Sequence, residues 1–248
     1  IPVVVHIIHN YGAENIADEQ VYDAIRILND DFNKLNSDIA GIIPAFQSRI
    51  ATVGFEFRLA RKDPNGNCTN GITRTVSALT YSANDNVKAL VSWPTNHYLN
   101  IWVVQNISFS AGGYSYLPGL EISSGLDGVV VVNRQFGSIG TSSGSNLASR
   151  TLTHEVGHWF NLSHVWGDGD IGSSANCSAF GDYVGDTPKT IGTNTNDCNL
   201  AQNTCHNELP DEVDNVQNFM DYSSCASMFT NGQKNRMIAA ANSAVSGR

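Results

Sequence analysis

One stretch of eleven residues constrains the fold of this chain more than any other feature. It runs from His154 to His164 and reads HEVGHWFNLSH. His154 and His158 are four residues apart, so a helix of 3.6 residues per turn puts both side chains on one face. Two imidazoles at this spacing can bind one tetrahedral zinc ion, and a third from His164 leaves one coordination position open. An open position is typical of catalytic zinc, so the motif predicts a metal centre built on a helix.

Glu155 follows the first histidine and is expected to hold a water molecule rather than to bind the ion. It would act as general base toward a zinc-bound water and then pass the proton to a leaving amine. The helix is expected over residues 147–161, and it must end at Asn161 so that the chain can bring His164 back to the metal. Such a turn needs a left-handed residue, and Asn is the best occupant after Gly.

A second motif lies at residues 218–222, which read NFMDY and resemble the Met-turn of metzincin peptidases. Together with the first motif, it is similar to the pappalysin family of metzincins, and in particular to the bacterial and archaeal cytophagalysin and ulilysin branch. Further stretches that share the resemblance are YLNIWVV at 98–104, DGVVV at 127–131, GDTP at 185–188 and MFTNGQ at 228–233. The likeness extends over nearly the whole chain and implies an enzyme, a zinc metalloendopeptidase.

The resemblance implies an α+β fold in which residues 1–248 form a single metalloprotease catalytic domain. An upper lobe, about residues 1–164, would contain a mixed twisted sheet and the active-site helix. A lower lobe, about residues 165–248, would be rich in loops and stapled by disulfides, with a cleft between the two. The chain has no internal repeat and no low-complexity linker, which agrees with one domain.

Apolar and alternating runs predict the strands of the sheet. The expected strands are residues 3–8, 55–59, 98–105 and 128–133. Between the last two, residues 108–119 are rich in Gly, Ser and Tyr. In the family this neighbourhood borders the cleft, so it either pairs with an extended peptide as an added strand or is a plain surface loop.

Two further helices are expected. The first covers residues 17–36, and its apolar stripe consists of Val21, Ile25, Leu28, Phe32 and Leu35. The last helix begins at Thr230 and Gln233, which resemble a capping box, and runs through Ala241.

The resemblance also assigns roles to two residues of the second motif. Met220 would form a hydrophobic floor under the zinc ligands and take no part in the chemistry; the alternative is ordinary core packing. Tyr222 would be a catalytic residue that donates a hydrogen bond to the tetrahedral oxyanion or binds zinc in the resting state. The alternative for Tyr222 is an ordinary side chain of the core or rim.

Five cysteines bear on the compartment of the protein. Four of them cluster after the zinc motif and allow three pairings, while Cys68 stands apart in a turn-like stretch as an idle thiol. The resemblance implies the disulfides Cys177–Cys205 and Cys198–Cys225. Such bridges would stiffen a loop-rich segment and indicate an oxidising compartment, so the protein would be secreted. The alternative, a second and structural zinc site, has no close CxxC spacing to support it.

Calcium is a second expected cofactor. Residues 181–188 read GDYVGDTP and resemble the calcium-binding loop of the family, whose candidate ligands here are Asp182, Asp186 and Thr187. Asp168 and Asp170 are further candidates, and the alternative for both sets is a solvated acidic loop. The net charge of −9 agrees with calcium binding or with simple solubility, and it argues against nucleic acid as a partner.

The expected partners are protein or peptide substrates, bound in extended form in the cleft of a monomer. No apolar run reaches the roughly 18 residues of a membrane span, and the start lacks both Met and a basic leader, which is typical of a mature or trimmed form. Two other functions stay open: hydrolysis of a non-peptide bond, and a catalytically silent peptide-binding module. The presence of Glu155 and all three histidines argues against the silent module.

The choice of cleavage site also stays open. Relatives that cleave next to Arg or Lys have an acidic residue between the Met-turn Tyr and the following Cys. Here that stretch contains only Ser223 and Ser224. A basic preference at the first primed position is therefore in doubt, and a smaller, neutral pocket is an equal alternative.

Overall fold

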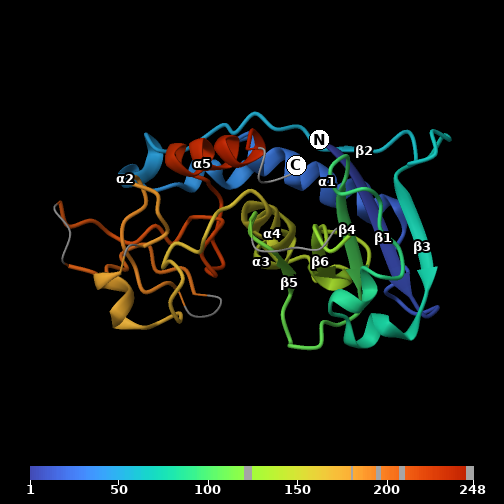
Figure 1. The fold of residues 1–248 in the computed structure, drawn as a ribbon. Helices are drawn as coiled ribbons and strands as arrows, with labels where there is room; N and C mark the ends of the chain where they lie inside the picture. The colour runs from blue at the N-terminus through green and yellow to red at the C-terminus, as the bar shows by residue number, and fades with distance from the viewer. Residues whose placement is uncertain (120–124, 180, 194–196, 207–209, 244–248) are drawn as a thin grey trace.

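A mixed sheet forms the larger part of the fold. The computed structural model describes residues 1–119, 125–179, 181–193, 197–206 and 210–243 (Figure 1). Within these ranges the sheet has six strands, and five of them are ordered β2-β1-β4-β6-β5. The sixth, β3, pairs with β1 at residues 5–9, which follow the two residues of β1 that pair with β2. The strands are β1 (Pro2–His9), β2 (Arg58–Leu59), β3 (Ile72–Val76), β4 (Leu99–Val104), β5 (Gly113–Ser115) and β6 (Val129–Val132). All pairs are parallel except β5 with β6, so the predicted mixed sheet is confirmed.

Three of the four predicted strands are confirmed to within one residue at each end, as β1, β4 and β6. These strands are buried on both faces, which explains their continuous runs of Val and Ile. In the fourth, residues 55–59, only Arg58 and Leu59 join the sheet. The side chain of Asn29 bonds both the N–H and the carbonyl of Phe57, at 2.9 Å each, and so replaces a neighbouring strand.

The helices pack mainly around one face of the sheet. They are α1 (Asp18–Phe32), α2 (Pro44–Gln47), α3 (Asn146–Ser149), α4 (Thr151–Trp159) and α5 (Asn231–Ala241). Short 3₁₀ turns are η1 (Ser37–Gly41), η2 (Ala78–Ser82), η3 (Asp85–Val87), η4 (Asn133–Gln135) and η5 (Ser174–Ser178). Apolar side chains of β1, β4, β6, α1, α4 and α5 share one core, which therefore fixes α4 against the sheet.

The helix predicted over residues 147–161 is two helices, α3 and α4, joined at Arg150. The backbone N–H of Arg150 donates to the carbonyls of Asn146 and Leu147. Its guanidinium lies 3.3 Å from the carboxylate of Asp31 on α1 and 3.2 Å from that of Asp38. These ion pairs tie the start of α4 to α1 and to η1, long-range contacts that periodicity does not reveal.

The apolar stripe predicted for the first helix is wrong at Leu35, whose side chain is 70% exposed. The helix α1 ends at Phe32, and Lys34 has a φ of 60°, so Leu35 leaves the helical stripe. At the other end of the chain the capping box of α5 is confirmed. The Thr230 hydroxyl accepts from the N–H of Gln233, and the Gln233 side chain accepts from the N–H of Thr230.

The segment between α4 and α5 is mostly turns, and it occupies the end of the molecule away from the sheet (Figure 1). Disulfides join Cys177 to Cys205 and Cys198 to Cys225, the pairs that the resemblance implies, and Cys68 is a free, exposed thiol. Each bridge closes a loop in a region with few ladder hydrogen bonds. Covalent closure is therefore a main restraint on this segment.

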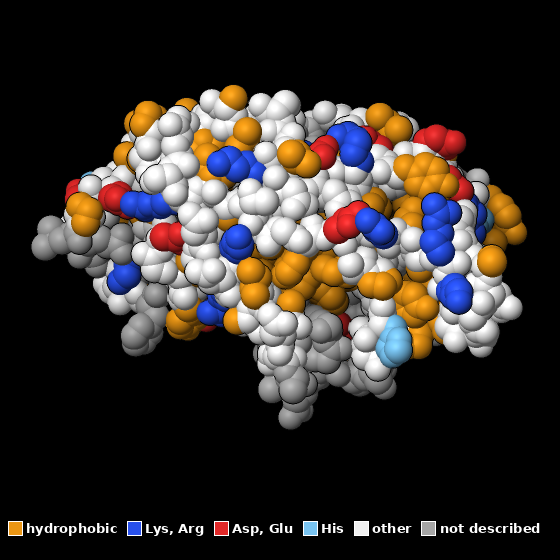
Figure 2. Space-filling view, turned by 90° about the horizontal axis from the view of Figure 1, so that it is seen from above, with side chains coloured by type: hydrophobic (Ala, Val, Ile, Leu, Met, Phe, Trp, Pro, Cys, Tyr) orange, Lys and Arg blue, Asp and Glu red, His pale blue; other side chains and the backbone are white. Residues whose placement is uncertain are grey.

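Two observations concern the surface. None of the described helices has the length and apolar character needed to cross a membrane. On the face seen in Figure 2, the Lys and Arg side chains of the described residues are scattered, and several lie beside acidic ones. This face therefore offers no continuous basic stripe of the kind that binds a phosphate backbone.

Removing one disulfide tests the role of covalent closure. The double substitution Cys198→Ser and Cys225→Ser opens a loop with a sequence separation of 27 residues. We expect it to lower the free energy of unfolding by about 3.5 kcal/mol, because the unfolded chain regains the entropy of the open loop. Guanidinium unfolding monitored by fluorescence measures this change. Cys68→Ser is the matched control and should leave the midpoint unaltered; equal curves for all three proteins would contradict the expectation.

Candidate active site

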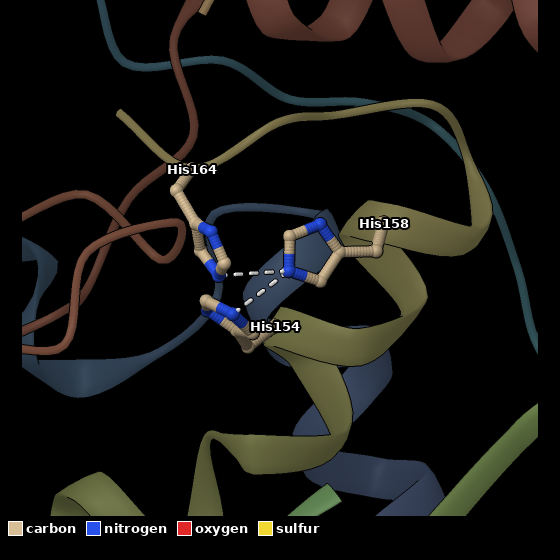
Figure 3. Close-up of side chains that lie close together, drawn as sticks. All are labelled: His154, His158 and His164. Atoms are coloured by element: carbon tan, nitrogen blue, oxygen red, sulfur yellow. Dashed lines mark hydrogen bonds between the residues drawn. The ribbon is translucent and has the colours of Figure 1, made fainter. Parts of the chain in front are cut away.

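Three histidine side chains meet at the end of α4. His154 and His158 project from one face of the helix, and His164 reaches them from the segment that follows (Figure 3). The Nε2 atom of His158 lies 3.1 Å from Nε2 of His154 and 3.1 Å from Nε2 of His164. Among the described residues, this is the one group of three or more potential ligands close enough to hold a metal ion.

The return of His164 depends on a tight turn at Asn161. Asn161 has a φ of 71°, so the predicted left-handed conformation is confirmed. Its N–H donates to the carbonyl of His158, and the next N–H, that of Leu162, donates to the carbonyl of Gly157. These bonds close the helix in the manner of a C-terminal cap. Beyond the turn, the ring of His164 stacks on Trp166 with centroids 4.3 Å apart and an interplanar angle of 7°.

The hydrogen bonds of the rings decide what their Nε2 atoms can do. Nδ1 of His154 lies 2.7 Å from the carbonyl oxygen of Phe219, and Nδ1 of His158 lies 2.7 Å from that of Leu162. A carbonyl oxygen only accepts, so each Nδ1 carries a proton and each neutral ring has a lone pair on Nε2. Burial favours the neutral form, lowering the pKa of His154 to about 3 and that of His158 to about 4.

This geometry fits a metal ion. The Nε2 lone pairs of His154 and His158 lie 3.1 Å apart with no proton between them, and they repel each other unless a cation lies beside them. Tetrahedral zinc with bonds of 2.0–2.1 Å to nitrogen keeps two ligand atoms about 3.3 Å apart. The spacing of His158 from the other two rings agrees with that value. The donor set of three imidazoles suits zinc among the common protein metals.

Met220 is completely buried and packs against the helix that carries His154 and His158. A Cβ atom on Gly157, in the middle of the helical motif, would lie 2.5 Å from the Met220 sulfur. The helix can therefore approach the Met220 side chain so closely only because residue 157 is Gly. The neighbouring Phe219 supplies the carbonyl that orients His154, so this turn also orients a ring of the cluster.

Glu155 is buried next to the histidines, on the side that faces β5. Burial is the largest cause that raises the pKa of its carboxyl, to about 8. The hydroxyl of Ser115, on β5, donates to the backbone carbonyl of Glu155 at 2.7 Å and lies 3.4 Å from its Oε2. Glu155 is thus held between its own helix and the edge strand of the sheet.

Tyr222 completes the cluster from the opposite side. Its hydroxyl lies 3.0 Å from Nε2 of His164, and its ring packs edge-on against His164 and Trp166. Desolvation, followed by the nearby carboxylate of Glu155, raises the pKa of the Tyr222 hydroxyl to about 12. The group therefore stays protonated at neutral pH and is able to donate a hydrogen bond.

A cavity of about 320 Å³ opens beside His154, Glu155 and Tyr222. Its remaining lining residues are Ala111, Gly112, Gly113, Gln135, Leu147, Arg150, Thr151, Phe219, Asp221 and Ala226. Ser115, Gln135 and Arg150 near this site belong to none of the motifs in the sequence. They come from segments far apart in the chain, and no spacing rule joins them to the zinc motif.

The predicted calcium ligands fall into two places. The Thr187 hydroxyl lies 2.7 and 2.8 Å from the two carboxylate oxygens of Asp182 and 2.9 Å from the carbonyl of Val184. The carboxylate of Asp186 instead accepts bonds from the Thr230 hydroxyl and the N–H of Gly232, at the start of α5.

Asp168 and Asp170 are exposed, and Asp168 accepts from the hydroxyl of Tyr183 at 3.1 Å. Neither belongs to a cluster of potential ligands within the described ranges. The candidate calcium ligands therefore divide into a buried group around Asp182, the half-buried Asp186 at the start of α5, and the exposed Asp168 and Asp170.

Comparison with known proteins agrees with this geometry. Residues 81–242 match the model of the M43 peptidase family described as pregnancy-associated plasma protein-A. An extracellular metalloprotease of Pyricularia oryzae is 31% identical in an alignment of 201 residues. The match covers 75% of this chain and 65% of that protein. Another from Colletotrichum graminicola is 28% identical and covers 90% of this chain and 68% of its own length.

A solved structure is similar over the whole chain. Mature mirolysin of Tannerella forsythia, in complex with a cleaved peptide, is 39% identical with a TM-score of 0.88, and the match covers 100% of this chain and 93% of mirolysin. A structure of mutant promirolysin from the same organism matches with the same TM-score. The fold, the three-histidine cluster and these matches together show that the chain belongs to the pappalysin, or M43, family of metallopeptidases.

Proposed function

We propose that this protein is a secreted zinc endopeptidase that hydrolyses peptide bonds within proteins. The observation that supports it best is the convergence of three neutral imidazoles beside a buried carboxylate and a cavity. His154, His158 and His164 are the proposed zinc ligands. Two disulfides and relatives named as extracellular enzymes support secretion.

The chemistry is divided between the ion and the side chains. Zinc, when bound, polarises the carbonyl of the substrate and acidifies water. Glu155 accepts a proton from the attacking water and then gives it to the leaving amine, so that one carboxyl serves as base and acid in turn. Its burial supports this role, because a desolvated carboxylate is a stronger base than an exposed one.

Removing the proposed base is the direct test. Glu155→Gln keeps the size of the side chain but cannot accept the proton. We expect kcat to fall by about 10²–10⁴-fold, while each chain still retains one zinc ion. Mass spectrometry of peptide cleavage measures the rate, and elemental analysis measures the zinc content. His164→Ala is the comparison that should lose both; a Glu155→Gln protein that cleaves at the original rate would refute the assignment.

Tyr222 is the second proposed catalytic residue. Its hydroxyl, 3.0 Å from Nε2 of His164, lies where it could donate to the negatively charged oxygen of the tetrahedral intermediate. The same position would let it bind zinc in the resting enzyme. Both roles need the hydroxyl and not the ring.

Tyr222→Phe separates these roles from packing. The ring contacts with His164 and Trp166 remain, so the melting temperature should change little. Without the hydroxyl, kcat should fall by about 10–10³-fold with little change in KM, since the lost bond forms in the transition state. Steady-state kinetics on one peptide decides the matter. Wild-type kcat in Tyr222→Phe would show that the side chain only packs.

Substrates are proposed to bind in extended form along β5, between an upper lobe of residues 1–164 and a lower lobe of residues 165–248. Among the described strands β5 pairs only with β6, and its other edge can offer N–H and carbonyl groups to a peptide. The peptide bound to mirolysin concerns a relative with the same fold, and it supports this placement. A monomer is sufficient for the proposed site, because every residue in it comes from one chain.

Calcium is proposed at the group around Asp182. Three acceptor oxygens, two of Asp182 and one of Val184, surround the single proton of the Thr187 hydroxyl. Burial raises the pKa of Asp182 to about 7, because its desolvation outweighs the hydrogen bonds that this carboxylate accepts and the charge of Arg236. A hard cation would satisfy all of these oxygens at once. Asp186 contacts α5 and is assigned a role as helix cap rather than ligand.

Thermal unfolding of zinc-loaded, calcium-depleted protein tests this site. Calcium at about 100 times its Kd should raise the free energy of unfolding by about 2.7 kcal/mol and the melting temperature by about 5–10 °C. Asp182→Asn should abolish this rise. Asp186→Asn is the matched control: it should lower the melting temperature by removing a cap, yet keep the rise. A melting temperature indifferent to calcium in the wild-type protein would rule the site out.

A further inference from the structure

We propose that the cavity beside Glu155 receives the substrate side chain next to the cleaved bond and selects uncharged, apolar residues over Lys and Arg. This inference rests on the proposed function and goes beyond it, since it names the class of cleavage site. It decides between the two alternatives that the residues after Tyr222 leave open.

The position of the cavity restricts which residue can occupy it. One end is formed by His154, Glu155 and Tyr222, the groups around the proposed reaction centre. Successive residues of an extended peptide are about 3.3 Å apart and alternate between two faces. Only a side chain immediately adjacent to the cleaved bond can therefore enter a space that touches these three residues.

The side of the bond on which that residue lies follows from the direction of the peptide along the edge strand. Gly112 and Gly113 line the cavity, and they precede Ser115, which contacts Glu155. We place the peptide antiparallel to β5, the direction in which β5 itself pairs with β6, so that its C-terminal part lies beside the beginning of this strand. The cavity is then the pocket of the first residue after the cleaved bond. A Cβ on Gly113 would lie 2.9 Å from Cγ of Glu155, so glycine keeps the strand close to the helix.

The two carboxylates of the wall are not available to a cation. Glu155 is the proposed base. In Asp221, Oδ1 accepts from the N–H groups of Thr193 and Ser223, and Oδ2 has no hydrogen-bond partner but is buried, so a cation in the cavity would have to displace part of the wall to reach it. A Lys or Arg side chain in the cavity would thus find no further carboxylate among its lining residues. A desolvated charge without a partner is strongly disfavoured.

The polar groups that do line the cavity are of the wrong kind for a cation. Arg150 is itself a cation, and its partners Asp31 and Asp38 are not lining residues. The amide oxygen of Gln135 already accepts from the Thr151 hydroxyl at 2.8 Å, and the NH₂ group of this amide only donates. A positive side chain would therefore meet a like charge and a neutral amide rather than a carboxylate.

The rest of the wall is apolar. Leu147 lies on α3, and Ala111 lies in the segment before β5. Phe219 and Ala226 belong to the segment around Met220. A volume of about 320 Å³ is large enough for Leu, Met or Phe. Burying such a side chain removes apolar surface from water and needs no hydrogen-bond partner.

A peptide series tests the preference. The peptides share one sequence and differ only at the residue after the cleaved bond, which is Leu, Met, Gln, Lys or Arg. For the wild-type enzyme we expect kcat/KM to be about tenfold or more higher for Leu and Met than for Lys and Arg. The affinities of the same peptides for the Glu155→Gln protein, measured by calorimetry, should follow the same order. This measurement tests the pocket without requiring turnover.

Two variants should shift the order. Gln135→Glu has nearly the same shape, still accepts from Thr151, and places a carboxylate in the wall; it should raise kcat/KM for Lys and Arg relative to Leu by about tenfold. Leu147→Glu adds the charge from α3, at a partly exposed position near a helix start that tolerates an acid. Gln47→Glu on α2 is the same chemical change outside the cavity and should leave the order unaltered.

The outcomes are distinct. Wild-type cleavage before Lys or Arg as fast as before Leu would overturn the inference, as would an unshifted order in both Gln135→Glu and Leu147→Glu. Peptides cleaved by none of the proteins, yet bound by Glu155→Gln in the expected order, would count against the proposed function while supporting the pocket.

Discussion

The arrangement of this site depends on one electrostatic constraint: the Nε2 atoms of three neutral imidazoles meet at a common point. Each ring of the helical pair is held by a carbonyl oxygen behind it, from Phe219 for His154 and from Leu162 for His158. These bonds fix the tautomer and leave only acceptors at the front. A folded chain tolerates such a cluster when a cation compensates for it, so the fold and the metal have to be considered together.

Several local features exist because of that cluster. Gly157 lets the helix approach Met220, and Asn161 turns the chain with a positive φ so that His164 can return. The edge strand is equally close, since Ser115 bonds the backbone of Glu155. Helix, turn and strand thus meet within a few ångströms of the reacting groups. The proposed substrate edge and the proposed base are parts of one packed unit.

Much of the fold could be predicted from local patterns. β1, β4 and β6 are buried on both faces, and unbroken β-branched runs such as theirs are typical of fully buried strands. The capping box at Thr230 depends only on residues three apart. The same patterns are wrong in predicting a full strand at residues 55–59 and a buried Leu35. In the first case Asn29 replaces the strand partner, and in the second the helix ends at Phe32, three residues before Leu35.

By itself the sequence determined the buried strands and the helix face that carries His154 and His158, because a spacing of four residues on a helix is a local geometric fact. His154, Glu155 and His158 needed no tertiary information. Tertiary structure alone decided the shape and charge of the cavity. Gln135, Arg150 and Ala226 meet there from segments far apart in the chain, and only the packing of α4 against the sheet brings them together. No periodicity encodes such a meeting, since it depends on the path of the whole backbone.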